Sequence, residues 1–241
     1  MTLGLLVCGV FSETIMQKYD GHYEDFFIKG LSAADASLSF KSYRVFENDF
    51  PRDVNECDAW LITGSVSGVY EDLAWIKRLL SFVQAAYAAD VPLIGICFGH
   101  QLIAQALGGH VIKSPKGWGL GRQCYDLHAD FEGVNDKKLA LYAIHQDQVV
   151  EVPPQAQVLA SSAHCPIAAL RYKGRALSFQ PHPEFSREFE TDLIDSLIDN
   201  KLTRAQAEAA FDTMKSKPVH NQQVMQAIAS FIRSTDKPDC D

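Results

Sequence analysis

A cysteine between two glycines is the residue whose setting most directly indicates covalent chemistry. The apolar-rich residues 92–94 lead into Gly95, Cys97 and Gly99, and residues 101–107 then have the composition of a helix. This order predicts a strand, a sharp turn and a helix, because glycines beside the apex remove Cβ atoms that so tight a backbone has no room for. A helix N-terminus also favours a thiolate. We therefore predict that Cys97 is a nucleophile at a cysteine version of the nucleophile elbow.

A histidine between two prolines supplies a second part of the constellation. Residues 180–184 read Gln-Pro-His-Pro-Glu and end a predicted strand at residues 176–180. The prolines keep the backbone extended, and alternate side chains of an extended segment share a face, so His182 and Glu184 can meet. A cysteine nucleophile needs a base, and the base needs an orienting carboxylate. We predict catalytic roles for Cys97, His182 and Glu184.

Each of these three residue types has a plainer interpretation when it is taken alone. A single cysteine is more often an inert buried thiol, a lone histidine is more often an ordinary loop residue, and a lone glutamate is usually a surface carboxylate. Packing does not explain an elbow, a histidine at a strand end and a carboxylate two residues further on. The combination favours nucleophilic catalysis.

The elements that must position these side chains follow an alternating pattern in the first half of the chain. Residues 72–89 carry apolar side chains at helical spacing, with Asp72 as the expected N-cap. Buried strands are predicted at residues 3–8, 43–46, 59–62 and 93–96. The order predicts an α/β fold, with a mostly parallel sheet and helices on both faces.

From about His110 short apolar segments follow one another with turns between them, and helices follow at the end. Antiparallel additions at one edge of the sheet are expected at residues 111–112, 121–127, 140–144, 158–160 and 167–172, before a return strand at residues 176–180. The tail has two apolar helical stripes and a helix start capped by Thr203. We assign residues 1–190 to a catalytic domain and residues 191–241 to a C-terminal helical extension packed on it, with residues 235–241 disordered.

Composition restricts the class of protein and its partners. The net charge of −8 over 241 residues disfavours nucleic acid. No apolar run of about 18 residues predicts a membrane span, and no basic residue precedes the apolar start, which predicts a buried strand in place of a signal peptide. The six cysteines form no C-x-x-C pair, which argues against zinc and disulfides and predicts a cytoplasmic protein. The sequence implies no metal and no organic cofactor.

Residues 95–101, which read Gly-Ile-Cys-Phe-Gly-His-Gln, and residues 180–184 resemble the motifs of the class I (triad) glutamine amidotransferases, which include the glutaminase modules of GMP synthase. The similarity covers roughly residues 1–190, and the helical tail is similar to stand-alone members such as the plant γ-glutamyl peptidases. The resemblance implies a flavodoxin-like sheet and a thioester mechanism. Cys97 would attack the side-chain carbonyl of a γ-glutamyl substrate, and His182 would protonate the departing ammonia or amine. Water would then hydrolyse the thioester while Glu184 orients the histidine.

The resemblance also implies an oxyanion hole. One donor is expected to be the N–H of Phe98, directly after the nucleophile. The family's glycine turn falls here on residues 61–66, which places the second donor at the N–H of Ser65, with Gly64 permitting the peptide to rotate. The alternative for this segment is an ordinary strand-end turn. The segment departs from the Gly-Gly-Pro version of GMP synthases, which leaves open whether the hole is preformed.

Further residues are expected near the substrate. Gln101, one helical turn beyond the nucleophile, matches a glutamine that the family uses there. His145, Gln146 and Asp147 resemble the family's Ser-His-Gly-Asp segment, whose backbone contacts the α-amino acid end of the substrate; a structural role for His145 stays equally open. His100 is expected to be a structural residue of the elbow helix.

Two segments keep alternative interpretations. Residues 19–27 either border the pocket or begin a helix, and the helix is favoured. Lys116 stands where many relatives carry an acidic residue, and it either alters the pocket or is solvated.

The sequence contains neither a G-x-x-x-x-G-K-[ST] loop nor a serine-glycine-rich pyrophosphatase loop. An acceptor of the ammonia is therefore either a separate protein or absent, and the similarity of the tail to stand-alone members favours a cysteine-dependent γ-glutamyl hydrolase that acts by itself on glutamine or γ-glutamyl amides. The alternative is a subunit that supplies ammonia to a separate synthetase. A protease-type or deglycase-type relative is less favoured, because such relatives usually lack the His-Pro-Glu segment, and a non-catalytic binding module is least favoured. The expected partners are a small γ-glutamyl substrate and, for the alternative, a separate synthetase subunit.

Overall fold

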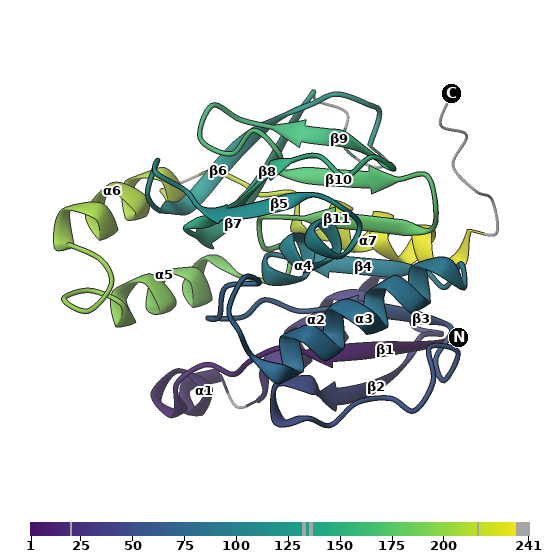
Figure 1. Cartoon of the computed structure of the whole chain (residues 1–241). Coiled ribbons are helices and arrows are strands. Elements are labelled where there is room, and N and C mark those ends of the chain that lie inside the picture. Colours follow the sequence, from purple (N-terminus) through teal and green to yellow (C-terminus); the bar gives the residue numbers. More distant parts are fainter. Residues whose placement is uncertain (20, 132–133, 135–136, 216, 235–241) are drawn as a thin grey trace.

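The computed structural model describes residues 1–19, 21–131, 134, 137–215 and 217–234, and a mixed sheet dominates this part of the chain (Figure 1). Within it the main sheet has nine strands in the order β2-β1-β3-β4-β11-β10-β9-β6-β7. The parallel strands are β2 (Ser39–Arg44), β1 (Thr2–Val7), β3 (Ala59–Ile62), β4 (Leu93–Ile96) and β11 (Ala176–Phe179). The antiparallel additions are β10 (Ala169–Tyr172), β9 (Ala156–Ser161), β6 (Gly119–Leu127) and β7 (Lys138–His145). The predicted fold class is confirmed.

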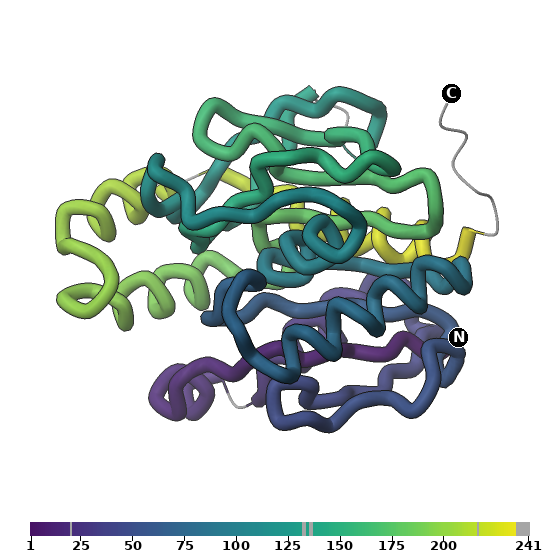
Figure 2. Tube along the Cα trace, viewed as in Figure 1, coloured from purple at the N-terminus to yellow at the C-terminus, as the bar shows by residue number. Residues whose placement is uncertain are grey.

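Helices cover both faces of this sheet, as the trace in Figure 2 also shows. α3 (Ala74–Ala88) and α4 (Phe98–Ala106) lie on one face, and α2 (Tyr23–Ala34) packs with α7 (Asn221–Arg233) on the other. A hydrophobic core lies on each face of the sheet. Successive side chains of a strand point to opposite faces, so Leu5 packs in the core on the side of α2 and Leu6 in the core on the side of α3.

Shorter elements complete the described part of the chain. They are α1 (Glu13–Tyr19), the 3-10 turn η1 (Val45–Glu47), α5 (Arg187–Ser196), α6 (Arg204–Met214) and a separate two-stranded sheet of β5 (His110–Lys113) and β8 (Asp147–Glu151). The predicted cap of α6 is confirmed, because the Thr203 hydroxyl accepts from the N–H of Gln206 at 3.3 Å. None of the described helices combines the length and apolar character needed to cross a membrane.

Three expectations from the pattern are wrong in detail. The strand predicted at residues 43–46 is β2, which begins at Ser39 and ends at Arg44. It is an edge strand with mostly polar, exposed residues, so it lacks the apolar pattern from which buried strands are predicted. Asp72 is not the N-cap of α3: Leu73 holds that position, and Asp72 forms an ion pair with Lys77. Residues 111–112 were expected at an edge of the main sheet, but they lie in β5, which pairs with β8 in a separate two-stranded sheet. The strand β8 itself was not predicted.

The tail contributes to the main core. Val224, Ile228 and Ile232 of α7 are fully buried in the cluster that also contains Phe27 and Leu31 of α2. The division of the chain at residue 190 stays a prediction, and the expected disorder of residues 235–241 lies outside the described residues.

Candidate active site

β4 and α4 meet at Cys97, where the backbone has an unusual conformation. Cys97 has φ 53° and ψ −101°, which is rare for a residue with a side chain. A Cβ on Gly95 would lie 2.5 Å from the backbone of Gly99, and one on Gly99 would lie 2.2 Å from the carbonyl oxygen of Ile62. Only glycine therefore lets the start of the helix approach the sheet so closely. The helix begins at Phe98, three residues earlier than the pattern indicated.

The pairing of β11 with β4 brings the histidine segment to the same edge of the sheet. The two strands are parallel, with Phe179 beside Ile96, and the N–H of Cys97 donates to the carbonyl oxygen of Phe179 at 2.8 Å. The carboxyl ends of parallel strands are where open α/β sheets bind their ligands. The structure therefore brings His182, which follows β11, to the cavity that Cys97 lines, and Glu184 contacts the histidine.

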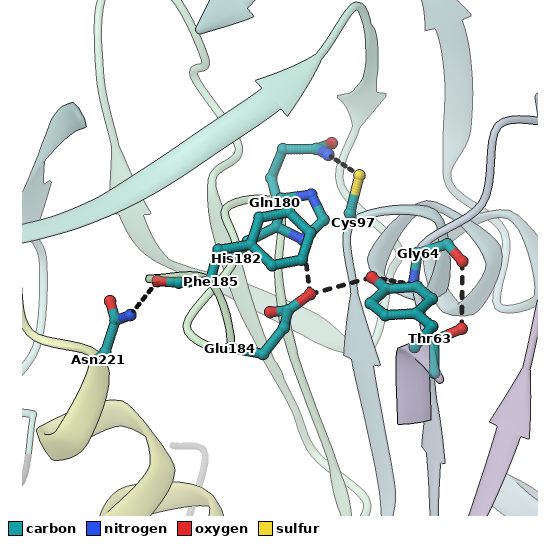
Figure 3. A network of polar contacts seen from close by, with 9 residues as sticks. Thr63, Gly64, Cys97, Gln180, His182, Glu184, Phe185 and Asn221 are labelled. Atoms are coloured by element: carbon teal, nitrogen blue, oxygen red, sulfur yellow. Dashed lines mark hydrogen bonds and ion pairs between the residues drawn. The ribbon is translucent and has the colours of Figure 1, made fainter. Parts of the chain in front are cut away.

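His182 is held in place on every side (Figure 3). Its Nδ1 lies 2.7 Å from Oε1 of Glu184, and both side chains are buried. Its main-chain N–H donates to the carbonyl oxygen of Tyr142 at 2.8 Å. The ring of Phe185 stacks on the imidazole, with centroids 4.2 Å apart and planes at 7°. These contacts fix the plane of the ring and direct Nδ1 to the carboxylate.

The electrostatics of His182 differ from those of an ordinary buried histidine. Burial opposes its protonation, but the electrostatic effects of the neighbouring Glu184 and Cys97 outweigh burial and raise the pKa of His182 well above its usual value. Its Nε2 is buried and has no hydrogen-bond partner among the described groups. That nitrogen is available to exchange a proton inside the cavity.

Gln180 and Gln101 form a short polar chain beside the thiol. The side-chain amide of Gln180 donates to Sγ of Cys97 at 3.6 Å (Figure 3). The amide nitrogen of Gln101 donates to Oε1 of Gln180 at 3.1 Å and to the carbonyl oxygen of Asp147 at 2.9 Å. Gln101 lines the cavity as expected, but its amide nitrogen is already bonded within the protein, so its carbonyl oxygen is the group left for a ligand.

The turn after β3 is fixed by hydrogen bonds on both sides of Gly64. The Thr63 hydroxyl accepts from the N–H of Cys8 at 3.0 Å and donates to the Gly64 carbonyl oxygen at 3.1 Å. In a trans peptide the N–H points opposite to the carbonyl, so the N–H of Ser65 is turned away from Thr63. Gly64 and Ser65 both line the cavity.

Tyr23 joins this turn to the histidine and glutamate pair, and sequence reasoning missed that role. Its hydroxyl donates to Oε1 of Glu184 at 3.0 Å and accepts from the N–H of Gly64 at 3.1 Å. Burial, followed by the charges of Glu184 and Cys97, raises the pKa of Tyr23 well above its usual value, so the hydroxyl stays a neutral donor. A Cβ on Gly64 would lie 2.7 Å from this hydroxyl. Both interpretations of residues 19–27 hold here, because Tyr23 begins α2 and also borders the cavity.

The remaining predicted residues lie at a polar part of the same cavity, whose volume is about 470 Å³. His145, Gln146 and Asp147 line it. Burial lowers the pKa of His145 to about 3, and its Nδ1 lies 3.2 Å from the Asp147 carbonyl oxygen. The Asp147 carboxylate accepts from the Tyr70 hydroxyl at 3.0 Å. The Nδ1 of a neutral His145 therefore supports the turn at Asp147. Its Nε2 is buried and has no hydrogen-bond partner among the described groups, so it remains available to a ligand.

Three other expectations concern His100, Lys116 and Phe98. His100 is fully buried, with Nδ1 2.8 Å from the Ser178 hydroxyl and Nε2 3.2 Å from the Ile167 carbonyl oxygen, so it has the contacts of a structural residue. The Lys116 ammonium donates to the carbonyl oxygen of Ala163 at 2.6 Å and does not line the cavity. The ring of Phe98 is buried in the core, and its N–H follows Cys97 in the first turn of α4, where helix N–H groups lack helical partners.

No group of three metal-binding side chains occurs among the residues that the structure describes. The five cysteines described are all free thiols.

The arrangement of a strained cysteine, a buried histidine and its glutamate invites comparison with known proteins. Residues 25–200 match the family model of the class-I glutamine amidotransferases. The chain belongs to this family. A glutamine amidotransferase-like protein of Schizosaccharomyces pombe is 32% identical over 204 residues, which cover 81% of this chain and 82% of that protein.

Other relatives of this amidotransferase differ in how much of it they match. γ-Glutamyl peptidase 5 of Arabidopsis thaliana is 28% identical over 230 residues and covers 91% of each chain. The glutamine-hydrolyzing GMP synthase subunit of Methanopyrus kandleri is 38% identical over 115 residues, which cover 44% of this chain and 58% of that protein. A crystal structure of a glutamine amidotransferase from Thermotoga maritima shares the fold, with a TM-score of 0.71 at 19% identity over 97% of this chain and 99% of that one.

Proposed function

We propose that this amidotransferase is a cysteine-dependent hydrolase that acts through a γ-glutamyl thioester on glutamine or γ-glutamyl amides. As a member of its family the chain is a hydrolase of carboxamide C–N bonds. One observation carries the finer proposal: His182 directs one ring nitrogen to Glu184 at 2.7 Å and leaves the other unpartnered in the cavity that Cys97 lines. This is the arrangement that a thiol nucleophile and its base require.

The first half of the proposed reaction transfers the γ-glutamyl group to the enzyme. Nε2 of His182 takes the thiol proton, and Sγ of Cys97 bonds to the amide carbon. The N–H groups of Ser65 and Phe98 hold the oxygen that becomes negative. Protonated His182 then gives its proton to the leaving nitrogen, the C–N bond breaks, and a thioester and an amine or ammonia result.

Water completes the cycle by attacking the thioester carbon while His182 takes its proton. The second tetrahedral intermediate uses the same two N–H groups, and its collapse returns a proton to the Cys97 sulfur and releases glutamate. Glu184 keeps Nδ1 protonated throughout, so that Nε2 is the nitrogen that moves protons.

We assign the polar part of the cavity to the α-amino acid end of the substrate. Gln101, His145, Gln146 and Asp147 supply carbonyl, imidazole and carboxylate groups there. An ammonium group has three donors and is matched by such acceptors. Gly64 keeps the opposite wall clear of a side chain.

The second candidate is an ammonia-supplying subunit for a separate synthetase, and the similarity to glutamine-hydrolyzing GMP synthase subunits supports it. Coverage favours the autonomous hydrolase, because the γ-glutamyl peptidase of Arabidopsis matches 91% of the chain and so includes its tail, whereas the synthase relative matches 44%. We place the activity in the cytoplasm, where free thiols such as the five described here persist.

Glutamate release by the purified chain separates these candidates. We expect release from glutamine or from γ-glutamyl dipeptides without any partner, and none from the Cys97→Ala variant. Release only after a synthetase is added would favour the second candidate. No release from any γ-glutamyl compound, alone or with a cell extract, would reject both.

A further inference from the structure

The cavity is divided chemically into two parts. In one part, polar groups are connected to one another through Asp147: Tyr70 bonds to its carboxylate, Gln101 bonds to its carbonyl oxygen, and Lys113 lies opposite it in the β5–β8 pairing. In the other part, Phe11, Phe185, Leu193 and Leu197 present apolar side chains. Glutamine needs the first part only, because its leaving group is ammonia.

The apolar part lies beside the general acid. The ring of Phe185 stacks on His182 at 4.2 Å, and Phe11 meets Phe185 at 5.9 Å. His182 must approach the leaving nitrogen to protonate it, so whatever that nitrogen carries extends past His182. We infer that the leaving group of the natural substrate occupies this apolar part.

The tail also contributes residues to the lining of the cavity. Leu193, Leu197 and Lys201 follow one another at intervals of four residues and all line the cavity. The apolar stripe that begins on α5 is divided between two environments, because Ile194 is fully buried while Leu193 and Leu197 are half-buried at the cavity. All three side chains pack with the same core cluster, and a bound apolar group would cover the part of Leu193 and Leu197 that this packing leaves exposed.

Lys201 gives this apolar wall a charge. Its side chain is exposed, and within the described parts of the chain its ammonium forms no ion pair or hydrogen bond. Lys113, the other lysine at the cavity, faces Asp147 across the β5–β8 pairing, so a carboxylate is already near it. A ligand carboxylate at the apolar end would therefore meet Lys201.

These observations select one class of leaving group. We propose that the enzyme favours γ-glutamyl dipeptides whose second residue has an apolar side chain, with the side chain against Leu193 and Leu197 and the free carboxylate on Lys201. The cavity of about 470 Å³ lies within the roughly 300–1,000 Å³ typical of sites for ligands of this size. The inference rests on the proposed γ-glutamyl hydrolase function and specifies its substrate.

Three matched substrates separate the two contributions. γ-Glutamyl-leucine carries both the apolar body and the carboxylate, γ-glutamyl-glycine lacks the apolar body, and γ-glutamyl-3-methylbutylamide lacks only the carboxylate. We expect kcat/KM for γ-glutamyl-leucine to exceed that for γ-glutamyl-glycine by roughly tenfold or more, as apolar pockets discriminate between side chains of these sizes. Glutamine should be the poorest of the four compounds.

The Lys201→Met variant keeps the apolar stem of the lysine and removes its charge. We expect it to lower kcat/KM for γ-glutamyl-leucine roughly fivefold, as for a partly exposed ion pair, and to leave the value for the 3-methylbutylamide unchanged. Lys173→Met is the matched control, because Lys173 is an exposed lysine that does not line the cavity. It should change neither value.

The outcomes distinguish this inference from the function on which it rests. Equal kcat/KM for γ-glutamyl-leucine and γ-glutamyl-glycine, or an equal loss for both apolar substrates in Lys201→Met, would overturn the inference while the hydrolase function stands. Absence of glutamate release from every compound would overturn the function and the inference together. Calorimetry with Cys97→Ala adds a readout without turnover, in which γ-glutamyl-leucine should bind more tightly than γ-glutamyl-glycine.

Discussion

Two of the buried histidines, His100 and His182, lie in environments that shift their pKa values in opposite directions. His100, inside the elbow helix, is 0% exposed, and burial lowers its pKa to about 3. His182, at the strand ends, is 3% exposed, and its pKa lies well above the usual value because Glu184 and Cys97 outweigh burial. The same desolvation acts on both rings, so a charged neighbour decides which of them can carry a proton. Two buried carboxylates differ in the same way. Glu184 contacts His182 and Tyr23, whereas neither side-chain oxygen of Glu190 has such a partner among the described groups.

The largest effect should come from replacing the two histidines separately. We expect His182→Gln to lower kcat by roughly 10⁴-fold or more, because the base and acid of both steps are lost. His100→Gln should lower the free energy of unfolding but leave the kcat of the folded fraction within a few-fold of wild type, because the ring nitrogens of His100 contact Ser178 and Ile167, which do not line the cavity. Glutamate release and denaturant unfolding measure the two quantities. A comparable loss of kcat in both variants would break the comparison.

Removing the charge of Glu184 should make the environment of His182 more like that of His100. Glu184→Gln keeps the shape of the side chain and takes away the carboxylate that raises the pKa of His182. We expect kcat to fall by roughly 10²–10⁴-fold, and NMR titration should show the pKa of His182 decreasing. A variant with lower kcat and an unchanged histidine titration would show that Glu184 does not act through the imidazole.

Tyr23→Phe should have a smaller effect, because it removes one neutral hydroxyl that connects Glu184 to Gly64. We expect kcat to fall roughly tenfold with little change in KM, together with a changed pH profile, since the carboxylate loses a donor. Tyr43→Phe is the control, because it removes a hydroxyl that donates to Glu56 at 2.9 Å outside the cavity. Equal kinetics for the two variants would assign Tyr23 a purely structural role.

The smallest effect on catalysis, and the clearest effect on stability, should come from Glu190. Burial raises its pKa to about 8, so between about pH 4.5 and 8 the folded state holds a proton that the unfolded state releases, and stability falls as the pH rises. The free energy of unfolding of the Glu190→Gln variant should fall by roughly 3 kcal/mol less than that of wild type between pH 5 and 8. Glu188→Gln, at an exposed site on the same helix, should behave as wild type.

The burial of His100 has the opposite effect on the pH dependence of stability, at acidic pH. Since the folded pKa of His100 is about 3 and the ordinary value is 6.5, the unfolded state binds the extra proton between these limits. Stability contributed by a neutral His100 is therefore complete above about pH 6.5 and decreases as the pH falls toward 3. Unfolding measured at several pH values should show this decrease in wild type and a weaker one in His100→Gln.

The sequence predicts best what is local along the chain. The conformation around Cys97 follows from its neighbouring glycines, and that around His182 follows from its neighbouring prolines. The alternation of strands and helices is enough to predict a parallel sheet. Residues 19–27 were considered as a border of the pocket, but the bond of Tyr23 to Glu184 was missed. The spacing of Tyr23 to Phe27 and Leu31 is that of an apolar helix face, and only the fold brings its hydroxyl to Glu184.

Residues whose position depends on distant pairing could not be predicted. The strand β8 has two exposed residues and pairs only with the short β5, so it has no apolar pattern of its own. The stripe containing Leu193 and Leu197 has the pattern of core packing, and its place at the cavity follows from where α5 lies after β11. A cavity wall and a core contact have the same pattern in the sequence.

The most direct test of the account is covalent trapping of the nucleophile. The purified chain should be labelled at Cys97 by a glutamine-mimicking electrophile such as a diazoketone analogue, and mass spectrometry should locate one adduct there, in parallel with complete loss of glutamate release. Excess γ-glutamyl substrate should slow the labelling. Labelling of another cysteine, with Cys97 unmodified and activity lost, would contradict the assignment of the nucleophile.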